Sequence, residues 1–367
     1  MFKFSNIFLH LKKLDWKLVF ILLALSAVSL LCLYSSCSAQ GNFANFYKQV
    51  FFIGSGFLLM FCLSFLDWRI FRENSFLILA LYFVCILLLV GLFFFTSEIR
   101  GTETWYKIGM FSFDPIEPTK LVLILLLAKY FSKRHVEMYK IQHIFLSGFY
   151  AFIPVVLVAV QPNMGSAALL LVVWLGILLV SGVKVRHFLL ICFSFAIIAV
   201  LGWNVFLQDY QKSRITSFLL PHSDPFGASW SRKQADIAIG SGQLIGQGWQ
   251  NGSQTRHGFL PEPQTDFIFS AFAEEFGLLG VAVLSALFAA FFWRVASLAL
   301  NAGSNFASLF AMGFAIIVFA QMFINMAMNM GLAPIVGLPL PFISYGGSNL
   351  LFLFASLGIL QSIKASS

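Results

Sequence analysis

Charged side chains are scarce in this sequence. Lys, Arg, Asp and Glu make up 10% of its 367 residues, whereas 59% of the residues are hydrophobic. Soluble globular domains average about 25% charged and about 45–50% apolar residues, so this composition excludes that class. Cysteine is rare as well: the five cysteines are odd in number and include no CxxC pair. Buried, unreactive thiols are therefore expected, and not a disulfide framework or a thiolate metal site.

Other signatures are missing too. No GxxxxGK[ST] sequence accompanies the glycine-rich segment Ala238–Gly248, so this segment is either a weak anion-binding loop or a set of tight turns. No internal repeat is visible, although transporters are often built from repeats. A cleavable signal peptide is not expected, because the first apolar run is long enough to remain as a membrane span.

Long apolar runs stand in place of these features. Runs of about 18 or more apolar residues are typical of membrane-spanning helices. Nine such runs occur near 17–37, 47–66, 75–96, 143–160, 165–182, 187–207, 266–293, 305–327 and 345–363, and a short one covers Leu121–Ala128. The sequence thus predicts an all-α polytopic integral membrane protein with about ten transmembrane helices, forming a single domain over residues 1–367.

The positions of the basic residues predict its topology. With ten crossings both termini lie in the cytoplasm, and the inner segments then hold 14 of the 23 Lys and Arg residues but only four of the 15 acidic ones. The positive-inside rule predicts this asymmetry. The basic net charge therefore reflects membrane topology, and no nucleic-acid partner is expected.

Polar residues collect on the predicted outer side. One long extracytoplasmic loop, about 208–265, contains stretches with enough apolar spacing for short helices of its own. The segments 100–120, 161–166 and 331–348 are also polar or broken by proline and glycine. Non-helical backbone at membrane depth must be satisfied by protein or water. We expect these four segments to converge on one outward-facing cavity.

Two polar residues open the short apolar helix. Pro118 suits a first helical turn, where its missing N–H costs nothing, and Glu117 and Lys120 are three residues apart and close enough to pair. The pair either lines the cavity as a functional site or caps the helix as a structural ion pair.

Three acidic residues lie in or beside the run at 266–293. Asp266 would be stabilised by the dipole of a helix that it opens, either as an ionised base at the water boundary or as an N-cap. On a straight helix Glu274 and Glu275 would lie about 12–13.5 Å deeper and on other faces. The deeper acids are therefore predicted to contact neighbouring helices or to be partly protonated, and not to cluster with Asp266.

Two functional classes fit an outward cavity with acids and cations. One is an enzyme that acts on a lipid-linked substrate at the outer membrane surface, and the other is a transporter or lipid flippase. The absence of a repeat and the short inner loops favour the enzyme.

Several long motifs resemble a known family. They are "LDW" (14–16), "WYKIG" (105–109), "QPNMGSA" (161–167), "QADIAIGSGQLIGQGWQNGSQ" (234–254), "FLPEPQTDFIFSAFAEEFGLLG" (259–280) and "VGLPLPFISYGGS" (336–348). In this order and over nearly the whole chain they resemble the SEDS family (shape, elongation, division and sporulation) of bacterial cell-wall polymerases, in particular its RodA-type rod-shape branch.

The resemblance implies a peptidoglycan glycosyltransferase. Such an enzyme polymerises lipid II into glycan strands during elongation, in the bacterial cytoplasmic (inner) membrane with its active site facing outward. A class B penicillin-binding protein would be the transpeptidase partner, together with the elongation machinery. The alternatives are a lipid II flippase of the same architecture and a non-catalytic scaffold for a transpeptidase.

The resemblance also implies site residues. Asp266 matches the family's essential aspartate and would act as general base on the acceptor sugar's 4-hydroxyl. The leaving group, undecaprenyl diphosphate, needs cationic stabilisation, for which Arg214, Lys120 and Lys233 are the candidates. Further substrate-binding candidates are Glu117, Gln161, Ser344 and Tyr345. A divalent cation could assist, but no cluster of ligands is evident.

Three positions depart from the family pattern. Gln264 stands where the family usually has His, Asn163 where it usually has Asp, and Thr104 where a basic residue often precedes the Trp. Each departure leaves the fold prediction unchanged, but together they leave open altered substrate contacts or reduced activity.

Overall fold

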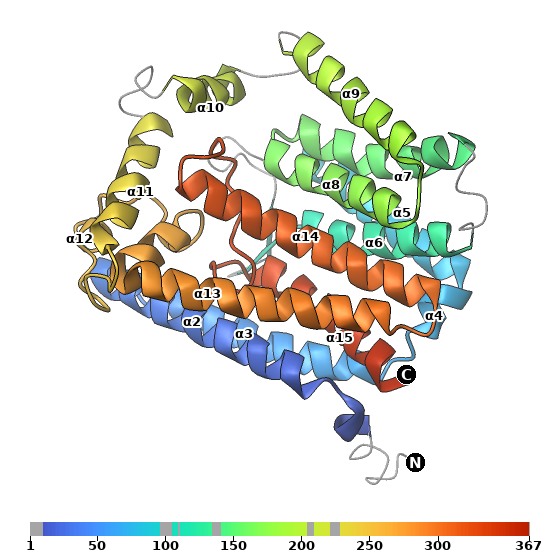
Figure 1. Cartoon of the computed structure of the whole chain (residues 1–367), viewed down its shortest axis with the longest axis horizontal. Coiled ribbons are helices and arrows are strands. Elements are labelled where there is room, and N and C mark those ends of the chain that lie inside the picture. Colours follow the sequence, from blue (N-terminus) through green and yellow to red (C-terminus); the bar gives the residue numbers. More distant parts are fainter. Residues whose placement is uncertain are drawn as a thin grey trace.

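The structure is a computed structural model that describes residues 10–95, 105–108, 111–133, 141–203, 209–220 and 228–366. Helices of 17 or more residues make up the main bundle (Figure 1). In the described part of the chain they are α2 (Trp16–Gln40), α3 (Ala44–Ser64), α5 (Ser75–Phe95), α6 (Ile116–Ser132), α7 (Ile141–Val160), α8 (Met164–Val180), α9 (Val185–Leu201), α13 (Ile268–Leu300), α14 (Asn305–Asn329) and α15 (Gly347–Ser366).

Shorter elements connect these helices. They are α4 (Arg69–Glu73), the strands β1 (Tyr106–Ile108) and β2 (Phe111–Phe113), α10 (Asp209–Leu219), α11 (Ala228–Gly242) and α12 (Ser253–Arg256). The two strands pair antiparallel. The helices α10, α11 and α12 lie in the long predicted loop, so the expectation of short helices there is confirmed.

Each predicted apolar segment coincides with one long helix, which confirms the all-α polytopic membrane fold. Seven of the helices are long and apolar enough to cross a membrane, while α8 and the apolar part of α9 are shorter. Helix α6 has 17 residues, most of them buried. The expectation that other helices surround this short segment is therefore confirmed.

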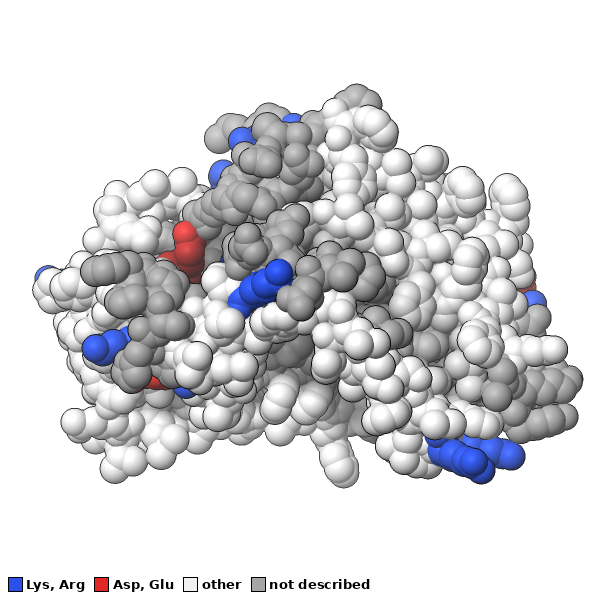
Figure 2. All heavy atoms as spheres, turned by 90° about the horizontal axis from the view of Figure 1, so that it is seen from above, with Lys and Arg blue, Asp and Glu red and all other residues white. Residues whose placement is uncertain are grey.

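Close backbone contact holds α15 along α3. A Cβ added at Gly358 would lie 2.9 Å from the Met60 carbonyl oxygen, so only glycine permits this approach. Without a strong hydrophobic drive between helices in lipid, small residues at such contacts let dispersion forces act at short range. On the face shown in Figure 2 the charged side chains are spread over the left half and appear again at the right edge, and most of the described surface between is white.

One end of the bundle, which we name the terminus end, brings together the first and last described helices. Asp15 caps α2 by accepting a hydrogen bond from the Leu18 N–H at 3.1 Å, and its own N–H donates to the Gln361 side chain at 2.8 Å. Arg294 of α13 donates to the Asp15 carboxylate, whose side chain is only 1% exposed. These contacts tie α2, α13 and α15 together.

Replacing Arg294 by Met is expected to lower the free energy of unfolding by about 3 kcal/mol, because it leaves the buried Asp15 carboxylate without its cation. The change would be measured as a shift in thermal unfolding of the purified protein. Arg72→Met is the matched control, because the Arg72–Glu73 pair is exposed (41% and 66%) and such pairs contribute at most about 1 kcal/mol. Equal losses in the two variants would contradict the expectation.

Helix α13 is broken at Gly277. This residue has φ 62° and ψ −165°, and an added Cβ would lie 2.3 Å from the Gly246 nitrogen. Four backbone hydrogen bonds join the chain on both sides of the break to the segment 243–248. The glycine-rich segment therefore makes tight turns that bind protein backbone, and the anion-loop alternative receives no support from these contacts.

The break lies just after the two glutamates. Glu274 and Glu275 lie just before Gly277, and α12 and the segment 247–252 pack against them. Residues 268–276, which lead to both acids, are helical, so the depth of the two acids relative to Asp266 stays a prediction. Both side chains are buried, so the expectation that they contact neighbouring elements is confirmed.

Candidate active site

The end of the bundle opposite the terminus end, which we name the loop end, gathers the polar segments. Ser344 donates its hydroxyl hydrogen to the Thr265 carbonyl at 2.6 Å. Ser348 accepts a hydrogen bond from the Asp114 N–H at 3.1 Å. At Gly165 an added Cβ would lie 2.8 Å from the Val336 carbonyl oxygen. Described residues of the four predicted segments therefore meet at this end. That they line one outward-facing cavity stays a prediction.

Asp266 lies in a turn just before α13 and is half-buried. Its carbonyl oxygen accepts hydrogen bonds from two amide side chains of α14, Asn325 at 3.1 Å and Asn329 at 2.9 Å. The carboxylate faces the backbone at Gly337, where an added Cβ would lie 3.5 Å from Oδ2. The position that caps α13 is Phe267, so the N-cap interpretation of Asp266 is wrong. The hydrogen bonds instead fix the turn that presents the carboxylate.

The sequence analysis missed the two asparagines. They stand in an apolar stretch of α14, where a polar residue is costly unless it is bonded, and that cost was the available signal. Asn325 also donates to the Leu338 carbonyl at 2.7 Å, and Asn329 accepts a hydrogen bond from Ser270 at 2.6 Å. These side chains connect the Asp266 turn to the loop before α15.

Gln264 explains one departure from the family pattern. Its amide group donates to the Gln40 side chain at 3.0 Å and accepts from Asn45 at 2.7 Å. Gln264 is buried and joins the end of α2 to the start of α3. This role needs a donor and an acceptor on one planar group, which an amide supplies without titrating.

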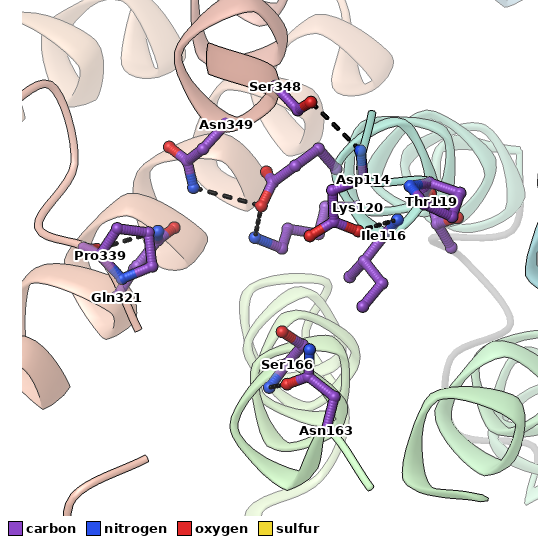
Figure 3. Close-up of polar contacts among 12 residues, drawn as sticks. Asp114, Ile116, Thr119, Lys120, Asn163, Ser166, Gln321, Pro339, Ser348 and Asn349 are labelled. Atoms are coloured by element: carbon purple, nitrogen blue, oxygen red, sulfur yellow. Dashed lines mark hydrogen bonds and ion pairs between the residues drawn. The ribbon is translucent and has the colours of Figure 1, made fainter. Parts of the chain in front are cut away.

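Lys120 and Glu117 form a buried ion pair at the start of α6. Their charged atoms are 2.7 Å apart, and the side chains are only 7% and 10% exposed. Asn349 of α15 donates to the same glutamate oxygen at 3.2 Å. Figure 3 shows Lys120 and Asn349 pointing toward one another at this contact. The pair therefore joins α6 to α15 and also places a cation at the loop end.

Asp114 is a third charged group beside this pair. Its Oδ1 accepts a hydrogen bond from the Ile116 N–H at 2.8 Å. Burial, and next to it the negative charge of Glu117, raise the pKa of Asp114 to about 7. An ordinary aspartate has a pKa near 3.9, so Asp114 titrates close to neutral pH.

This raised pKa predicts a pH-dependent stability. At a pH between the pKa of Asp114 in the unfolded chain, about 3.9, and its pKa in the folded protein, about 7, the folded protein binds more protons than the unfolded chain. The free energy of unfolding therefore falls as the pH rises toward about 7 and levels off above it. Thermal unfolding between pH 5 and pH 8 should show this trend. Asp114→Asn keeps an acceptor for the Ile116 N–H and should flatten the profile. The same slope in both proteins would contradict the expectation.

The other predicted cations lie on the helices of the long loop. Arg214 is exposed on α10 and Lys233 is exposed on α11. The sequence analysis missed Arg232. A Cβ added at Gly331 would lie 2.6 Å from the guanidinium Nε of Arg232, and the centre of this guanidinium lies 5.6 Å from the Phe218 ring centre. Arg232 thus links α10 and α11 to the loop that follows α14. Its neighbour Lys233 remains exposed.

The remaining predicted residues have these positions. Gln161 is buried and donates to the Leu89 carbonyl of α5 at 2.7 Å. Ser344 also accepts from the Leu340 N–H at 2.8 Å, so its hydroxyl supports the Asp266 turn. The Tyr345 N–H donates to the Gln264 carbonyl at 2.8 Å, and burial raises the pKa of its phenol. Their roles toward a substrate stay predictions.

The last two departures differ in outcome. Asn163 caps α8 by accepting a hydrogen bond from the Ser166 N–H at 3.2 Å, and Figure 3 shows both residues at the start of this helix. Asparagine and aspartate are about equally good caps, so this substitution preserves the local structure. Thr104 lies outside the described residues. Among the residues that are described, no three His, Cys, Asp or Glu side chains are grouped as metal ligands.

The chain matches known proteins over nearly its full length. A family profile for FtsW, RodA and SpoVE, described as "Cell cycle protein", matches residues 12–367. This chain belongs to the FtsW/RodA/SpoVE family. The "Peptidoglycan glycosyltransferase MrdB" of Escherichia coli strain K12 is 35% identical over 350 residues, covering 95% of this chain and 93% of that protein. "Stage V sporulation protein E" of Bacillus subtilis is 30% identical, covering 96% of this chain and 97% of that protein.

Two solved structures share the fold of this family member. A chain from a "peptidoglycan synthase complex" superposes with a TM-score of 0.82 at 30% identity, covering 96% of this chain and 98% of that one. The "Rod shape determining protein RodA" of Thermus thermophilus gives a TM-score of 0.71 at 28% identity, with 96% of each chain covered. The resemblance to the SEDS polymerases and its RodA-type branch is therefore confirmed.

Proposed function

We propose that this member of the FtsW/RodA/SpoVE family is a peptidoglycan glycosyltransferase that polymerises lipid II during cell elongation. One observation carries the proposal. Asp266 lies on a turn where the loop-end segments meet, and the side chains of Asn325 and Asn329 hold this turn by hydrogen bonds to the Asp266 carbonyl oxygen. A carboxylate on a fixed turn is suited to act as the general base of a glycosyl transfer. Relatives with this chemistry in their names match nearly the whole chain.

The proposed reaction uses Asp266 as general base. Its carboxylate takes the proton from the 4-hydroxyl of the acceptor sugar while that oxygen forms a bond to the anomeric carbon of the donor. The bond from that carbon to the diphosphate oxygen breaks, and undecaprenyl diphosphate leaves with the bonding electrons. Arg214, Lys120 and Lys233 are the cations proposed to stabilise its developing charge. Glu117, Gln161, Ser344 and Tyr345 complete the proposed substrate site.

The contacts at the terminus end support an enzyme over a flippase. Besides the Asp15–Arg294 pair, Trp68 stacks on Phe306 with ring centres 6.0 Å apart, and Lys129 donates to the Phe71 carbonyl at 3.2 Å. An alternating-access transporter would have to open this end, and each of these contacts opposes that.

Orientation and partners are parts of the same proposal. We place the chain as a single domain in the bacterial cytoplasmic (inner) membrane, with the loop end outside. A solved relative is part of a "peptidoglycan synthase complex", which supports a class B penicillin-binding protein as transpeptidase partner within the elongation machinery.

The deciding experiment supplies labelled lipid II to the purified protein together with its partner transpeptidase. We expect glycan polymer from the wild-type protein. Lipid scrambling in vesicles without any polymer would instead support a flippase, and normal growth of cells that carry only Asp266→Asn would support a scaffold.

A further inference from the structure

A polar cavity lies at the loop end, on the side of α2 away from the Asp266 turn. Its volume is about 650 Å³, and its wall includes Ser35 and Ser38 of α2, the segment 249–252, Thr255 and Arg256 of α12, and Glu275. Gln264, which precedes Asp266, contacts α2 through Cys37 and Gln40. Residues 35 and 37 point about 200° apart on a helix, so α2 stands between this cavity and the Asp266 turn.

The two adjacent glutamates differ in what surrounds them. Both oxygens of Glu274 are occupied by α12, which donates the N–H groups of Gln254 at 2.6 Å and Thr255 at 3.2 Å, and the Thr255 hydroxyl at 2.9 Å. Glu274 therefore serves as the anchor of α12. Glu275 instead forms part of the cavity wall.

Glu275 keeps acceptor capacity toward the cavity. The residue is 3% exposed, and its carboxyl group accepts hydrogen bonds from the Ser35 hydroxyl and from the backbone of Gln250. Burial raises the pKa of this group to about 7. An ionised carboxylate can accept about four hydrogen bonds, and burying one costs free energy unless donors satisfy it. A carboxylate in a cavity wall is therefore suited to ligand groups that donate hydrogen bonds.

Trp249 gives the cavity a fixed aromatic wall. The residue is 43% exposed, its indole N–H donates to the Leu31 carbonyl at 3.1 Å, and the Tyr34 ring lies 5.6 Å away. The adjacent Gln250 has φ 64°, a conformation that costs about 1–3 kcal/mol outside glycine and is often retained at binding sites. The ring is thus positioned before any ligand arrives.

The lining discriminates between ligand classes. An acyl chain would meet mainly polar side chains. A phosphate would find a cation in Arg256 but would also meet the carboxylate of Glu275. A sugar chain suits both parts of the wall, because the C–H face of a pyranose packs on an aromatic ring while its hydroxyl and amide groups bond Asn, Gln and Glu side chains.

We propose that this cavity is a saccharide subsite that binds a glycan strand of β-1,4-linked N-acetylated amino sugars. The inference rests on the proposed function, since such a strand is the product of that reaction. Trp249 stacks on one sugar ring, Glu275 accepts from a hydroxyl or amide N–H, and Gln250 and Asn251 supply further polar contacts. The subsite retains the strand between successive additions.

The binding test uses the full-length Asp266→Asn protein in lipid nanodiscs, because many detergents carry sugar headgroups. The probe is the β-1,4-linked tetramer of N-acetylglucosamine, with affinity measured by calorimetry and by saturation-transfer NMR. We expect Trp249→Ala to weaken binding at least about tenfold, Glu275→Gln to weaken it, and Trp249→Phe to retain most of it. Trp293→Ala is the matched control, because Trp293 is 76% exposed on the long part of α13.

The inference is overturned if the tetramer does not bind, or if it binds the Trp249→Ala protein as tightly as the parent. A second readout is the length of strands made from lipid II, which should fall several-fold in Trp249→Ala and not in Trp293→Ala. Polymerisation without tetramer binding would remove the subsite and leave the proposed function standing. If the tetramer binds in a way that depends on Trp249 but the wild-type protein makes no polymer, the subsite stands and the proposed function is wrong.

Discussion

Asp266→Asn is expected to reduce glycan polymerisation by about 10²–10⁴-fold, the usual contribution of a general base. The amide is nearly isosteric with the carboxylate but cannot take a proton from the acceptor hydroxyl. The main-chain hydrogen bonds from Asn325 and Asn329 to this residue do not depend on its side chain. The variant should therefore unfold at nearly the wild-type temperature while it loses polymer formation in the lipid II assay.

Asp236→Asn is the matched control for this experiment. Asp236 lies on α11 with a side chain that is 51% exposed, 3.9 Å from Arg232. The same chemical change there should alter the polymerisation rate less than about twofold, because exposed pairs of this kind contribute little. If Asp266→Asn polymerises lipid II as fast as Asp236→Asn, another residue is the base.

Lys120→Met is expected to destabilise the protein by about 3–5 kcal/mol, because it leaves Glu117 buried without its cation. The double variant Lys120→Met/Glu117→Gln removes both charges and should recover most of the lost stability. The side-chain amide that Glu117→Gln introduces can still accept the hydrogen bond from Asn349. Thermal unfolding of the two variants and of the wild type measures this difference.

Polymerisation by the double variant separates the two roles of the pair. If Lys120 stabilises the leaving diphosphate, the double variant should fold well and remain at least about 100-fold less active. A double variant that regains activity along with stability would show a purely structural pair. Lys120 Nζ and Glu117 Oε1 are 2.7 Å apart in the wild type and both side chains are buried, so removing the pair tests both roles.

Much of the fold could be predicted because apolar run length determines a membrane helix. The helix of Leu121–Ala128 was expected to be short and surrounded, and α6 is buried along most of its length. The site was harder to predict. Asp266 could be found from a motif, but the hydrogen bonds from Asn325 and Asn329 depend on how α14 packs against the turn, and no local sequence signal specifies that packing.

The break in α13 shows where sequence reasoning fails physically. The apolar run at 266–293 was predicted to form one continuous helix. Gly277 ends that geometry with a φ of 62°, and a single glycine in an apolar run does not reveal whether it only flexes the helix or breaks it. The partners that decide the outcome, residues 243–248, lie about 30 positions earlier in the chain.

The break in α13 also has a consequence for how the chain enters the membrane. A continuous helix of 33 residues would be about 50 Å long, well beyond a hydrocarbon core about 30 Å thick, whereas residues 278–300 alone extend about 35 Å. We therefore expect the inserted segment to be the part after Gly277. The nine residues before it reach their place by assembling with the segment 243–248, which is synthesised first, so formation of the Asp266 turn should be a late step of biogenesis, completed only after the long loop has been translocated and folded.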